Sequence, residues 1–369
     1  MTRRMSVGGV AIGGGAPITV QSMTNTDTRD VQATLAQIRA LADAGCDLVR
    51  VSVYDEACAK AVRPLADASP VPLVADIHFD HTLAIRAVEN GVHKLRVNPG
   101  NIGGEANVRR VADCARAHGV PIRVGVNSGS VERALLDKHG GPTPQAMADS
   151  ALSHARLLEK HGFYDIVLSA KASGVHDTIA VNRLLASQCE YPLHIGVTEA
   201  GLPGQVGLPG QGGLPGQVGL PGQGTIKSAI GIGSLLADGI GDTIRVSLSG
   251  DPVPEVAAGL SILRALGLRG GVEIISCPTC GRAALDVAGI AQRIEAETRG
   301  WTERIKVAVM GCVVNGPGEA READLGLAGG KSGAALFRRD KPPEKVTGDP
   351  CEALLAALDA ARRERQETQ

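Results

Sequence analysis

A regular alternation of strand-like and helix-like segments runs through residues 18–267 and limits the possible folds more than any other feature of the sequence. Short runs rich in Val, Ile and Leu are each followed by a longer stretch rich in Ala and Leu. Most of these stretches close with Gly, a common signal of a helix C-terminus. The strand-like runs are residues 18–23, 47–53, 72–79, 94–100, 121–129, 165–173, 192–201 and 242–250. Eight strand–helix units in about 250 residues predict an α/β fold of the (β/α)8 type, the TIM barrel.

A doubly wound open sheet is the alternative interpretation of the same alternation. That fold usually carries a Gly-rich dinucleotide-binding loop directly after its first strand. Here the Gly-rich segment GGVAIGGGAP (8–17) precedes the first strand-like run and does not open a helix. We therefore interpret residues 1–268 as a TIM-barrel domain that binds the substrate.

The pattern changes at about residue 270, where a second domain is expected to begin. VEIISCPTC (272–280) and ERIKVAVMGC (303–312) each read as a strand that runs into a cysteine. A helix-like stretch lies between them, and the chain ends with another at residues 351–367. The turn-rich residues 331–350 are expected to be exposed. Residues 269–369 are therefore predicted to form a small α+β domain.

Composition excludes several classes of protein. The net charge of −1 argues against a general nucleic-acid or membrane-surface binder, since such proteins usually carry a basic excess. No apolar run reaches the roughly 18 residues that a membrane span needs. The first residues show no long apolar segment of the signal-peptide type, so a cytoplasmic protein is the default.

One segment departs from both patterns. Residues 201–224 read GLPGQV-GLPGQG-GLPGQV-GLPGQG, with Gly at every third position. This composition is collagen-like, but the segment is short for a triple helix, and nothing else in the sequence suggests a trimeric stalk. We expect an extended, mobile loop that is inserted after the seventh strand, on the face where barrel active sites lie.

The strongest chemical motif is a set of cysteines in the second domain. Cys277-Pro-Thr-Cys280 is followed by Cys312, and the Asn-Gly-Pro-Gly loop after Cys312 leads to Glu319. Thiolates are soft ligands that suit zinc or iron–sulfur clusters. Three cysteines and one weaker carboxylate ligand would leave one replaceable position. A structural zinc site and a thioredoxin-like dithiol remain as alternatives, although no His follows Cys280 to complete a zinc set.

A second constellation depends on the barrel. The strand ends of a barrel share one rim, and here they carry five cations, which are Arg50, Arg96, Arg123, Lys171 and Arg245. The polar residues expected beside them are Asn98, Asn127, Glu199 and Ser247. Five converging cations repel one another, and an anionic substrate with phosphate-like groups would offset that repulsion. Asp76, His78 and Asp80 also follow a strand, as a hydrogen-bonded cluster, a proton-transfer group or a weaker divalent-metal site.

Several runs of the sequence resemble a known family. They are VQSMTNTDT (20–28), VADIHFD (74–80), LRVNPGNIG (95–103), IRVGVNSGS (122–130), VTEAG (197–201), KSAIGIG (227–233), GIGDTIRVSLS (239–249), CPTC (277–280) and GCVVNGPGEA (311–320). With these runs the chain resembles the bacterial 4-hydroxy-3-methylbut-2-enyl diphosphate synthases from about residue 7 to 335. The paired cysteine motifs make the resemblance specific, because generic barrels do not carry them.

The resemblance implies an activity and a set of roles. The family converts 2-C-methyl-D-erythritol 2,4-cyclodiphosphate into 4-hydroxy-3-methylbut-2-enyl diphosphate, with a [4Fe-4S] cluster and two electrons from ferredoxin or flavodoxin. Carried over by motif, the cluster ligands are Cys277, Cys280, Cys312 and Glu319, and the diphosphate contacts are Arg50, Arg96, Asn98, Arg123, Lys171, Arg245 and Ser247. Glu199 is the implied acid/base or orienting carboxylate. The family also implies a homodimer in which one chain's cluster domain caps the other chain's barrel.

The chain departs from the family pattern after Glu199. The family usually has a short Gly/Ala/Arg/Ser segment between TEAG and KSAIG, whereas this chain has the Gly-Leu-Pro-Gly-Gln repeats. Loop-closure entropy makes such a lengthening cost only on the order of 1 kcal/mol. Two other functions stay open at this point: a barrel lyase or aldolase with a structural zinc tail, and a non-catalytic cluster-binding sensor.

Overall fold

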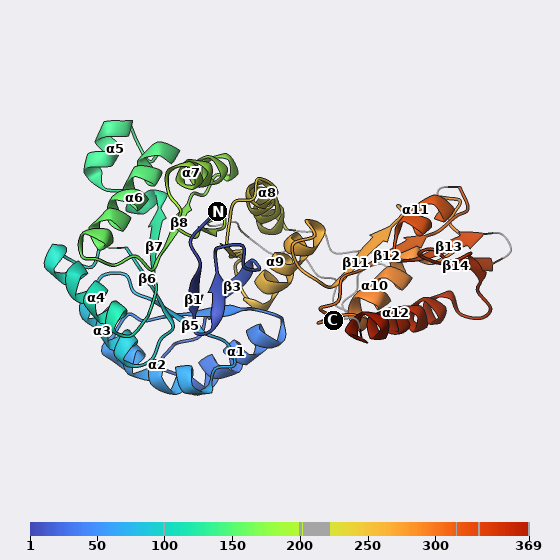
Figure 1. Ribbon diagram of the computed structural model, residues 1–369, viewed down its shortest axis with the longest axis horizontal. Coiled ribbons are helices and arrows are strands. Elements are labelled where there is room, and N and C mark those ends of the chain that lie inside the picture. Colours follow the sequence, from blue (N-terminus) through green and yellow to red (C-terminus); the bar gives the residue numbers. More distant parts are fainter. Residues whose placement is uncertain (99, 199–200, 202–221, 315, 331–332, 368–369) are drawn as a thin grey trace. The chain divides into compact units, whose positions relative to one another are not determined.

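The computed structural model describes residues 1–98, 100–198, 201, 222–314, 316–330 and 333–367 (Figure 1). Its contacts divide the chain into two compact units, Met1–Leu266 and Gly267–Gln369. Within the described residues, no helix is both long and apolar enough to cross a membrane.

The first unit is built on an eight-stranded parallel sheet. Its strands are β3 (Thr19–Met23), β4 (Leu48–Ser52), β5 (Leu73–Asp76), β6 (Lys94–Val97), β7 (Ile122–Asn127), β8 (Ile166–Lys171), β9 (His194–Ile195) and β10 (Thr243–Ile244). They follow the order β8-β7-β6-β5-β4-β3-β10-β9, and a parallel bridge between Leu168 and Leu193 joins the two ends. The sheet is thus closed, and the predicted (β/α)8 barrel is confirmed.

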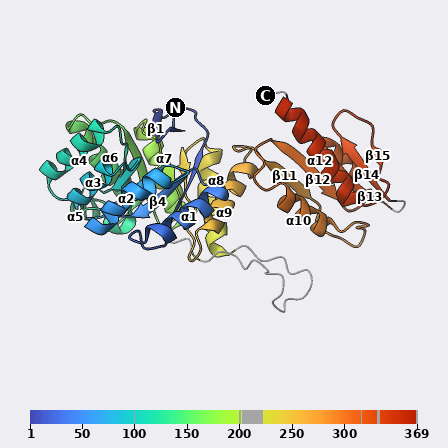
Figure 2. The same cartoon turned by 90° about the horizontal axis from the view of Figure 1, so that it is seen from below.

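Helices follow the strands around the outside of this barrel (Figures 1 and 2). They are α1 (Val31–Asp43), α2 (Glu56–Ala68), α3 (His81–Glu89), α4 (Glu105–Ala117), α5 (Arg133–His139), α6 (Pro144–Lys160), α7 (Val175–Gln188), α8 (Gln223–Ala237) and α9 (Val253–Ala265). Polar caps start several of them, as where the Asp30 carboxylate accepts the Ala33 N–H at the start of α1.

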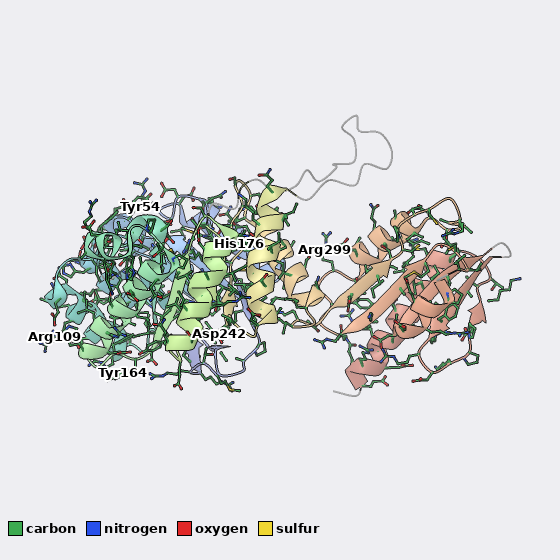
Figure 3. The ribbon with its side chains drawn as sticks, turned by 90° about the horizontal axis from the view of Figure 1, so that it is seen from above. Tyr54, Arg109, Tyr164, His176, Asp242 and Arg299 are labelled. Atoms are coloured by element: carbon green, nitrogen blue, oxygen red, sulfur yellow. The ribbon has the colours of Figure 1, made fainter. Side chains whose placement is uncertain are left out.

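Side chains along each strand point alternately outward into the hydrophobic core and inward to the barrel interior, where the site lies. Val49 and Val51 of β4 face outward and are fully buried in the large aliphatic core between strands and helices. Because side chains alternate along a strand, Arg50 faces the barrel interior. The core contains few aromatic rings, and Tyr54 and Tyr164 lie on the outer surface, more than half exposed (Figure 3).

A short hairpin that the sequence did not reveal closes the amino-terminal end of the barrel. Strands β1 (Met5–Val7) and β2 (Val10–Ile12) pair antiparallel. Their buried residues Val7 and Ile12 pack against Leu48, Val74 and Val167, which lie near the starts of β4, β5 and β8. The carboxyl-terminal end of the barrel is left for a site.

The second unit is a five-stranded sheet with helices on both faces. Its strands are β11 (Val272–Ser276), β12 (Ile305–Met310), β13 (Leu325–Gly330), β14 (Gly333–Arg338) and β15 (Glu344–Lys345), in that spatial order. Strands β11, β12 and β13 are parallel, and the other pairs are antiparallel. Helices α10 (Val287–Glu297) and α12 (Pro350–Glu367) cover one face, and α11 (Gly316–Glu322) packs on the other.

Two expectations need correction. Residues 331–350 were expected to be an exposed, turn-rich segment, but within them β14 is a strand whose Leu336 and Phe337 are 5% and 4% exposed. The Gly and Pro residues around this strand concealed its short apolar run. Most of the repeat at 201–224 lies outside the described residues, and its last two residues, Gln223 and Gly224, already belong to helix α8.

Candidate active site

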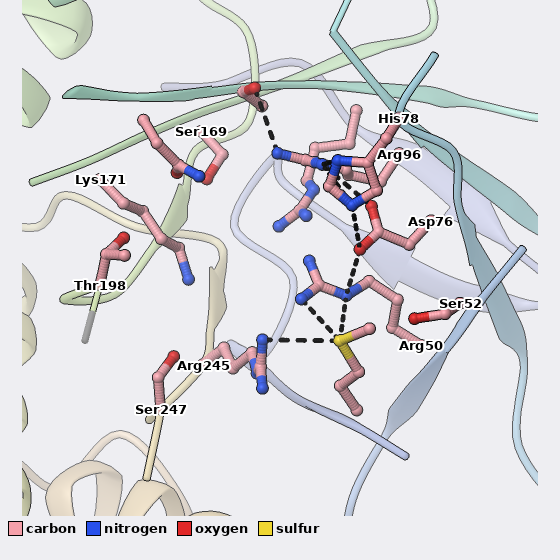
Figure 4. A pocket seen from close by; sticks show the side chains of 14 residues that line it. Arg50, Ser52, Asp76, His78, Arg96, Ser169, Lys171, Thr198, Arg245 and Ser247 are labelled. Atoms are coloured by element: carbon pink, nitrogen blue, oxygen red, sulfur yellow. Dashed lines mark hydrogen bonds and ion pairs between the residues drawn. The ribbon is translucent and has the colours of Figure 1, made fainter. Parts of the chain in front are cut away.

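A polar cavity of about 270 Å³ opens at the carboxyl-terminal ends of the barrel strands (Figure 4). Because β-strand ends in a barrel share this face, side chains from several strands meet there. The lining residues are Met23, Arg50, Ser52, Asp76, His78, Arg96, Arg123, Gly125, Asn127, Ser169, Lys171, Thr198, Arg245 and Ser247.

The structure brings together most of the residues that the sequence singled out in the barrel. All five cations line the cavity, together with Asn127 and Ser247. Asn98 is not among the lining residues and is only 3% exposed, and its Oδ1 accepts the Gly100 N–H at 3.1 Å. Glu199 lies outside the described residues.

Asp76, at the end of β5, organises one side of the cavity. Its carboxylate lies 3.6 Å from Arg50 Nε, 3.1 Å from Arg96 Nη1 and 3.4 Å from His78 Nε2. Burial alone would raise the pKa of Asp76, but Arg50, His78 and Arg96 together lower this pKa well below its usual range. Asp76 therefore stays ionised and fixes two guanidinium groups.

His78 and Asp80, the other two ionisable residues of the ADIHFD motif (75–80), lie in different surroundings. His78 shares the cavity with Asp76 and is about half exposed, with a side-chain exposure of 54%. Asp80 instead caps helix α3, where its Oδ1 accepts the Thr82 N–H at 2.7 Å. A hydrogen-bonded structural role thus accounts for Asp80, and the three residues do not form one cluster.

A second buried carboxylate supports the opposite side. Glu255 of α9 is 3% exposed and lies 3.4 Å from Arg245 Nε. It also accepts hydrogen bonds from Ser22 Oγ at 2.8 Å and from the Leu248 N–H at 3.0 Å. Sequence reasoning missed Glu255, because it lies on a helix and not at a strand end.

The remaining two cations, Arg123 and Lys171, form no ion pair with a carboxylate among the described residues. Arg123 is 2% exposed, and its Nε and Nη1 have no hydrogen-bond partner among the described residues. Burial, followed by Arg50 and Arg96, lowers the pKa of Arg123. Burial, followed by Arg123 and Arg245, likewise lowers the pKa of Lys171 far below its usual value. These two groups are the least compensated positive charges in the described part of the cavity.

Arg50 has a contact that is easily exchanged. Met23 Sδ accepts from its Nε and Nη2 at 3.1 and 2.8 Å. A thioether is a weak acceptor, so an anionic oxygen would replace it favourably. Burial is the main reason why the pKa of Arg50 falls to about 10, which still leaves the group charged at neutral pH.

Small residues make room for these cations. A Cβ atom on Gly125 would lie 2.7 Å from Arg96 Nε, and one on Gly196 would lie 2.7 Å from Lys171 Nζ. Both distances are too short for a side chain at these positions. Ser52, Ser169 and Thr198 add hydroxyl groups to the lining, and no sequence pattern separates them from other strand residues.

The charge balance of the cavity determines what it can bind. Five cations and the two carboxylates Asp76 and Glu255 leave three positive charges when all seven groups are ionised. Arginine forks bind phosphate oxygens in pairs, and a lysine adds a point charge. The cavity therefore suits a compact substrate with more than one phosphate group.

The cysteines form a different kind of site in the second unit. Cys277 directly follows β11, and Cys312 follows the adjacent parallel strand β12, so both emerge at the same edge of the sheet. The Gly311 N–H donates to Cys277 Sγ at 3.2 Å, and the Ala284 N–H donates to the Gly311 carbonyl at 2.7 Å. These bonds hold the CPTC turn against the turn that carries Cys312.

The ligand set at this edge is not assembled. Cys280 and Glu319 are exposed, and Glu319 lies in the first turn of α11. Across the described ranges, no three His, Cys, Asp or Glu side chains are arranged so that they could hold a metal ion. By donor chemistry, three thiols and a carboxylate still fit an iron–sulfur cluster, because thiolates are the usual ligands of such clusters.

A cation-lined pocket at the carboxyl end of a closed barrel, with a cysteine-bearing second unit, defines a class of two-domain barrel enzymes for phosphorylated substrates. Comparison with protein families gives the particular family. Residues 2–208 and 216–260 match the GcpE TIM-barrel domain, and residues 273–360 match the GcpE protein C-terminal domain. The chain belongs to the GcpE family.

Three curated proteins that are similar to this chain share the same name. A protein of Caldanaerobacter subterraneus subsp. tengcongensis is 54% identical over 342 residues, which are 92% of this chain and 91% of the relative. One of Nitratidesulfovibrio vulgaris is 54% identical over 97% of this chain and 88% of its own length. One of Geobacter sulfurreducens is 52% identical over 97% of each chain. Each is named 4-hydroxy-3-methylbut-2-en-1-yl diphosphate synthase (flavodoxin).

Proposed function

We propose that the chain is an oxidoreductase that converts 2-C-methyl-D-erythritol 2,4-cyclodiphosphate into 4-hydroxy-3-methylbut-2-enyl diphosphate. The observation that carries this proposal is the cavity of five cations in a chain of the GcpE family. In the reaction a ring carbon–oxygen bond breaks and leaves its oxygen on phosphate, two electrons and one proton enter, and a hydroxyl group leaves as water.

The barrel residues bind the substrate and stabilise charge. A cyclic diphosphate has one negative charge on each phosphate, and ring opening frees a phosphate oxygen and adds another. The cavity has three positive charges in excess, so its field favours the ring-opened state over the closed ring. Arg123 and Lys171 contribute most to this preference, because within the described ranges neither forms an ion pair with a carboxylate.

Hydrogen-bonding residues complete the proposed substrate site. Asn127 and Ser247 line the cavity and orient the diphosphate next to the five cations. Asn98 has an unpaired, buried Nδ2 that is available to a substrate oxygen once the loop after β6 adjusts. Glu199 is the acid/base or orienting carboxylate for the leaving hydroxyl group.

A [4Fe-4S] cluster is the proposed cofactor, with Cys277, Cys280, Cys312 and Glu319 as its ligands. Such a cluster supplies single electrons to the substrate in succession. Glu319 is the weaker ligand of the four, and its exposed position on α11 leaves it free to move. Flavodoxin or ferredoxin is the proposed electron donor, and the relatives' printed names favour flavodoxin.

Turnover is the direct test. Anaerobically reconstituted protein should convert the cyclic diphosphate into the linear diphosphate with reduced flavodoxin, and the same protein without reconstitution should not. A colourless zinc-containing protein that cleaves phosphorylated compounds without a reductant would instead support a barrel lyase. A brown protein that contains iron and sulfide but gives no turnover would support a cluster-binding sensor.

The chain is further proposed to act as a homodimer in which the cluster unit of one protomer serves the barrel of its partner. Mixing two inactive variants tests this arrangement. When a protein with Arg123→Gln and one with Cys277→Ser are refolded or co-expressed together, random pairing should give about a quarter of the wild-type activity and heterodimers alone about a half, because each heterodimer has one intact site out of two. If each protomer serves itself, the mixture stays inactive.

A further inference from the structure

Beneath the cavity, the barrel interior contains a second layer of polar side chains. Gln21 of β3, Lys94 of β6 and His194 of β9 are 1%, 0% and 0% exposed. Their sequence neighbours, such as Val20, Leu95 and Ile195, pack outward in the aliphatic core, so these three face the barrel axis. None of them is among the residues that line the cavity of Figure 4.

These side chains have no hydrogen-bond partners in the described part of the chain. Neither polar atom of the Gln21 side chain, nor Lys94 Nζ, nor either ring nitrogen of His194 is paired. Nε and Nη1 of Arg123 are unpaired in the same way. Native proteins pair nearly all such buried groups with protein atoms or with a bound ligand or water, so the layer lacks a component.

The chemistry of the layer indicates what that component is. Lys94, Arg123, His194 and Gln21 offer several N–H donors, whereas the acceptors are the Gln21 Oε1 and one His nitrogen. After burial, the pKa of Lys94 is lowered by Arg123 and Arg50, and the pKa of His194 by Arg123, Lys171, Lys94 and Arg50. An excess of donors among positive charges favours an anion.

We propose that Gln21, Lys94, Arg123 and His194 form a buried anion site inside the barrel, which takes a small monovalent inorganic anion such as chloride. The anion accepts hydrogen bonds from Lys94 Nζ and from Arg123, and it offsets part of the charge that the substrate does not neutralise. It also holds Arg123 from beneath, so that the guanidinium is fixed before the diphosphate arrives.

Anomalous diffraction from bromide tests the site directly. Crystals of the full chain grown with sodium bromide and saturating pyrophosphate, which fills the cation-lined cavity, should show an anomalous peak within hydrogen-bond distance of Lys94 Nζ. Peaks confined to the protein surface or to the cavity, with only water density in the layer, would overturn the proposal.

Thermal unfolding in solution tests the proposed anion site independently of the crystals. At constant ionic strength and with saturating pyrophosphate, chloride should raise the Tm of the wild-type protein by about 2 °C or more over gluconate. Lys94→Met should lose this chloride-specific increment, while Lys60→Met, which removes an exposed lysine of α2, should keep it. An equal chloride increment in Lys94→Met would contradict the proposal.

The pyrophosphate and halide measurements together distinguish a failure of the proposed anion site from a failure of the proposed function. If pyrophosphate itself fails to raise the Tm, the diphosphate cavity is wrong, whatever the halide does. If pyrophosphate binds but the halide has no effect on wild-type protein, only the buried anion site is wrong. If Lys94→Met does not fold, the anomalous bromide peak in crystals of the wild-type protein still tests the proposed anion site.

Discussion

The cation-lined cavity and the cysteine edge are built on different principles. In the cavity, Arg50, Arg96, Arg123 and Lys171 lie within strands, and the one buried carboxylate of Asp76 holds the first two in place. At the cysteine edge, the thiols follow the strand ends, Cys280 is exposed, and the described residues form no ligand set. The barrel fold itself places the cations of the cavity, whereas the proposed cluster would bring the cysteine ligands together.

This difference has an energetic consequence. At the cavity, burial and the neighbouring cations lower the pKa of Arg123 and of Lys171, so a bound anion would stabilise their charged forms. At the cysteine edge, the proposed cluster would draw its ligands together, because metal binding couples to local folding. Variants in the two regions should therefore respond in opposite ways.

The largest effect is expected at the cysteine edge. Cys277→Ser should lower turnover at least about 1,000-fold and reduce bound iron and sulfide, because the hydroxyl group is a poor substitute for a thiolate ligand. Pyrophosphate binding by the barrel should stay within about twofold of wild type. Iron analysis, turnover and calorimetry measure the three quantities.

Cys114→Ser is the matched control. Cys114 lies on α4 of the barrel and is partly buried, so this change should leave iron content and turnover intact. If Cys277→Ser retained a full cluster, or if it abolished pyrophosphate binding, the two sites would not be independent as described.

Asp76→Asn should give the next largest effect, on the stability of the barrel. The change removes the counter-charge of the buried Arg50 and Arg96, and breaking a buried ion pair costs about 3–5 kcal/mol. Asp80→Asn, at the exposed cap of α3, should cost less than about 1 kcal/mol, because Asn also caps helices. Denaturant unfolding compares the two, and equal losses would show that Asp76 is not the organising charge.

Arg123→Gln should separate binding from stability. It removes the least compensated guanidinium, so pyrophosphate affinity should fall about 10- to 100-fold, as expected for hydrogen bonds to charged groups. The Tm of the ligand-free protein should stay equal or rise, because a strained charge is lost. Calorimetry and thermal unfolding measure both, and a large fall in Tm without a loss of affinity would contradict the account.

A smaller effect is expected in the pH dependence of stability. Burial and neighbouring cations lower the pKa of His194 well below 6.5, so the folded protein keeps this ring neutral while the unfolded chain binds a proton. Stability should therefore fall as the pH drops below about 6.5, with up to 1.4 kcal/mol per pH unit from this group. His194→Gln should show a shallower slope between pH 6 and 5, and an unchanged slope would mean that His194 protonates in the folded state.

The sequence predicted the barrel well, because eight strand–helix units leave few alternatives. It also placed the five cations on one rim, since residues at strand ends such as Arg50 and Lys171 must meet there. The hairpin of β1 and β2 was missed, because two three-residue strands between glycines carry no periodicity. Strand β14 was missed for a similar reason.

The supporting residues of the site were harder to predict than the cations. Glu255 lies on a helix, and its role follows only from the position of Arg245 in space. Gly125 is required by the close approach of Arg96, which no local pattern reveals. Asn98 was expected at the cavity but is not among its lining residues, and its Oδ1 accepts the Gly100 N–H in the turn that follows.

The central claim is that the anion-binding barrel and the cysteine-held cluster serve one reaction. EPR of the reduced, reconstituted protein, recorded with and without saturating 2-C-methyl-D-erythritol 2,4-cyclodiphosphate, tests this claim most directly. The account predicts that the substrate changes the cluster signal of the wild-type protein, and that Arg123→Gln needs about 10- to 100-fold more substrate for the same change. A wild-type signal that is identical with and without substrate would contradict it.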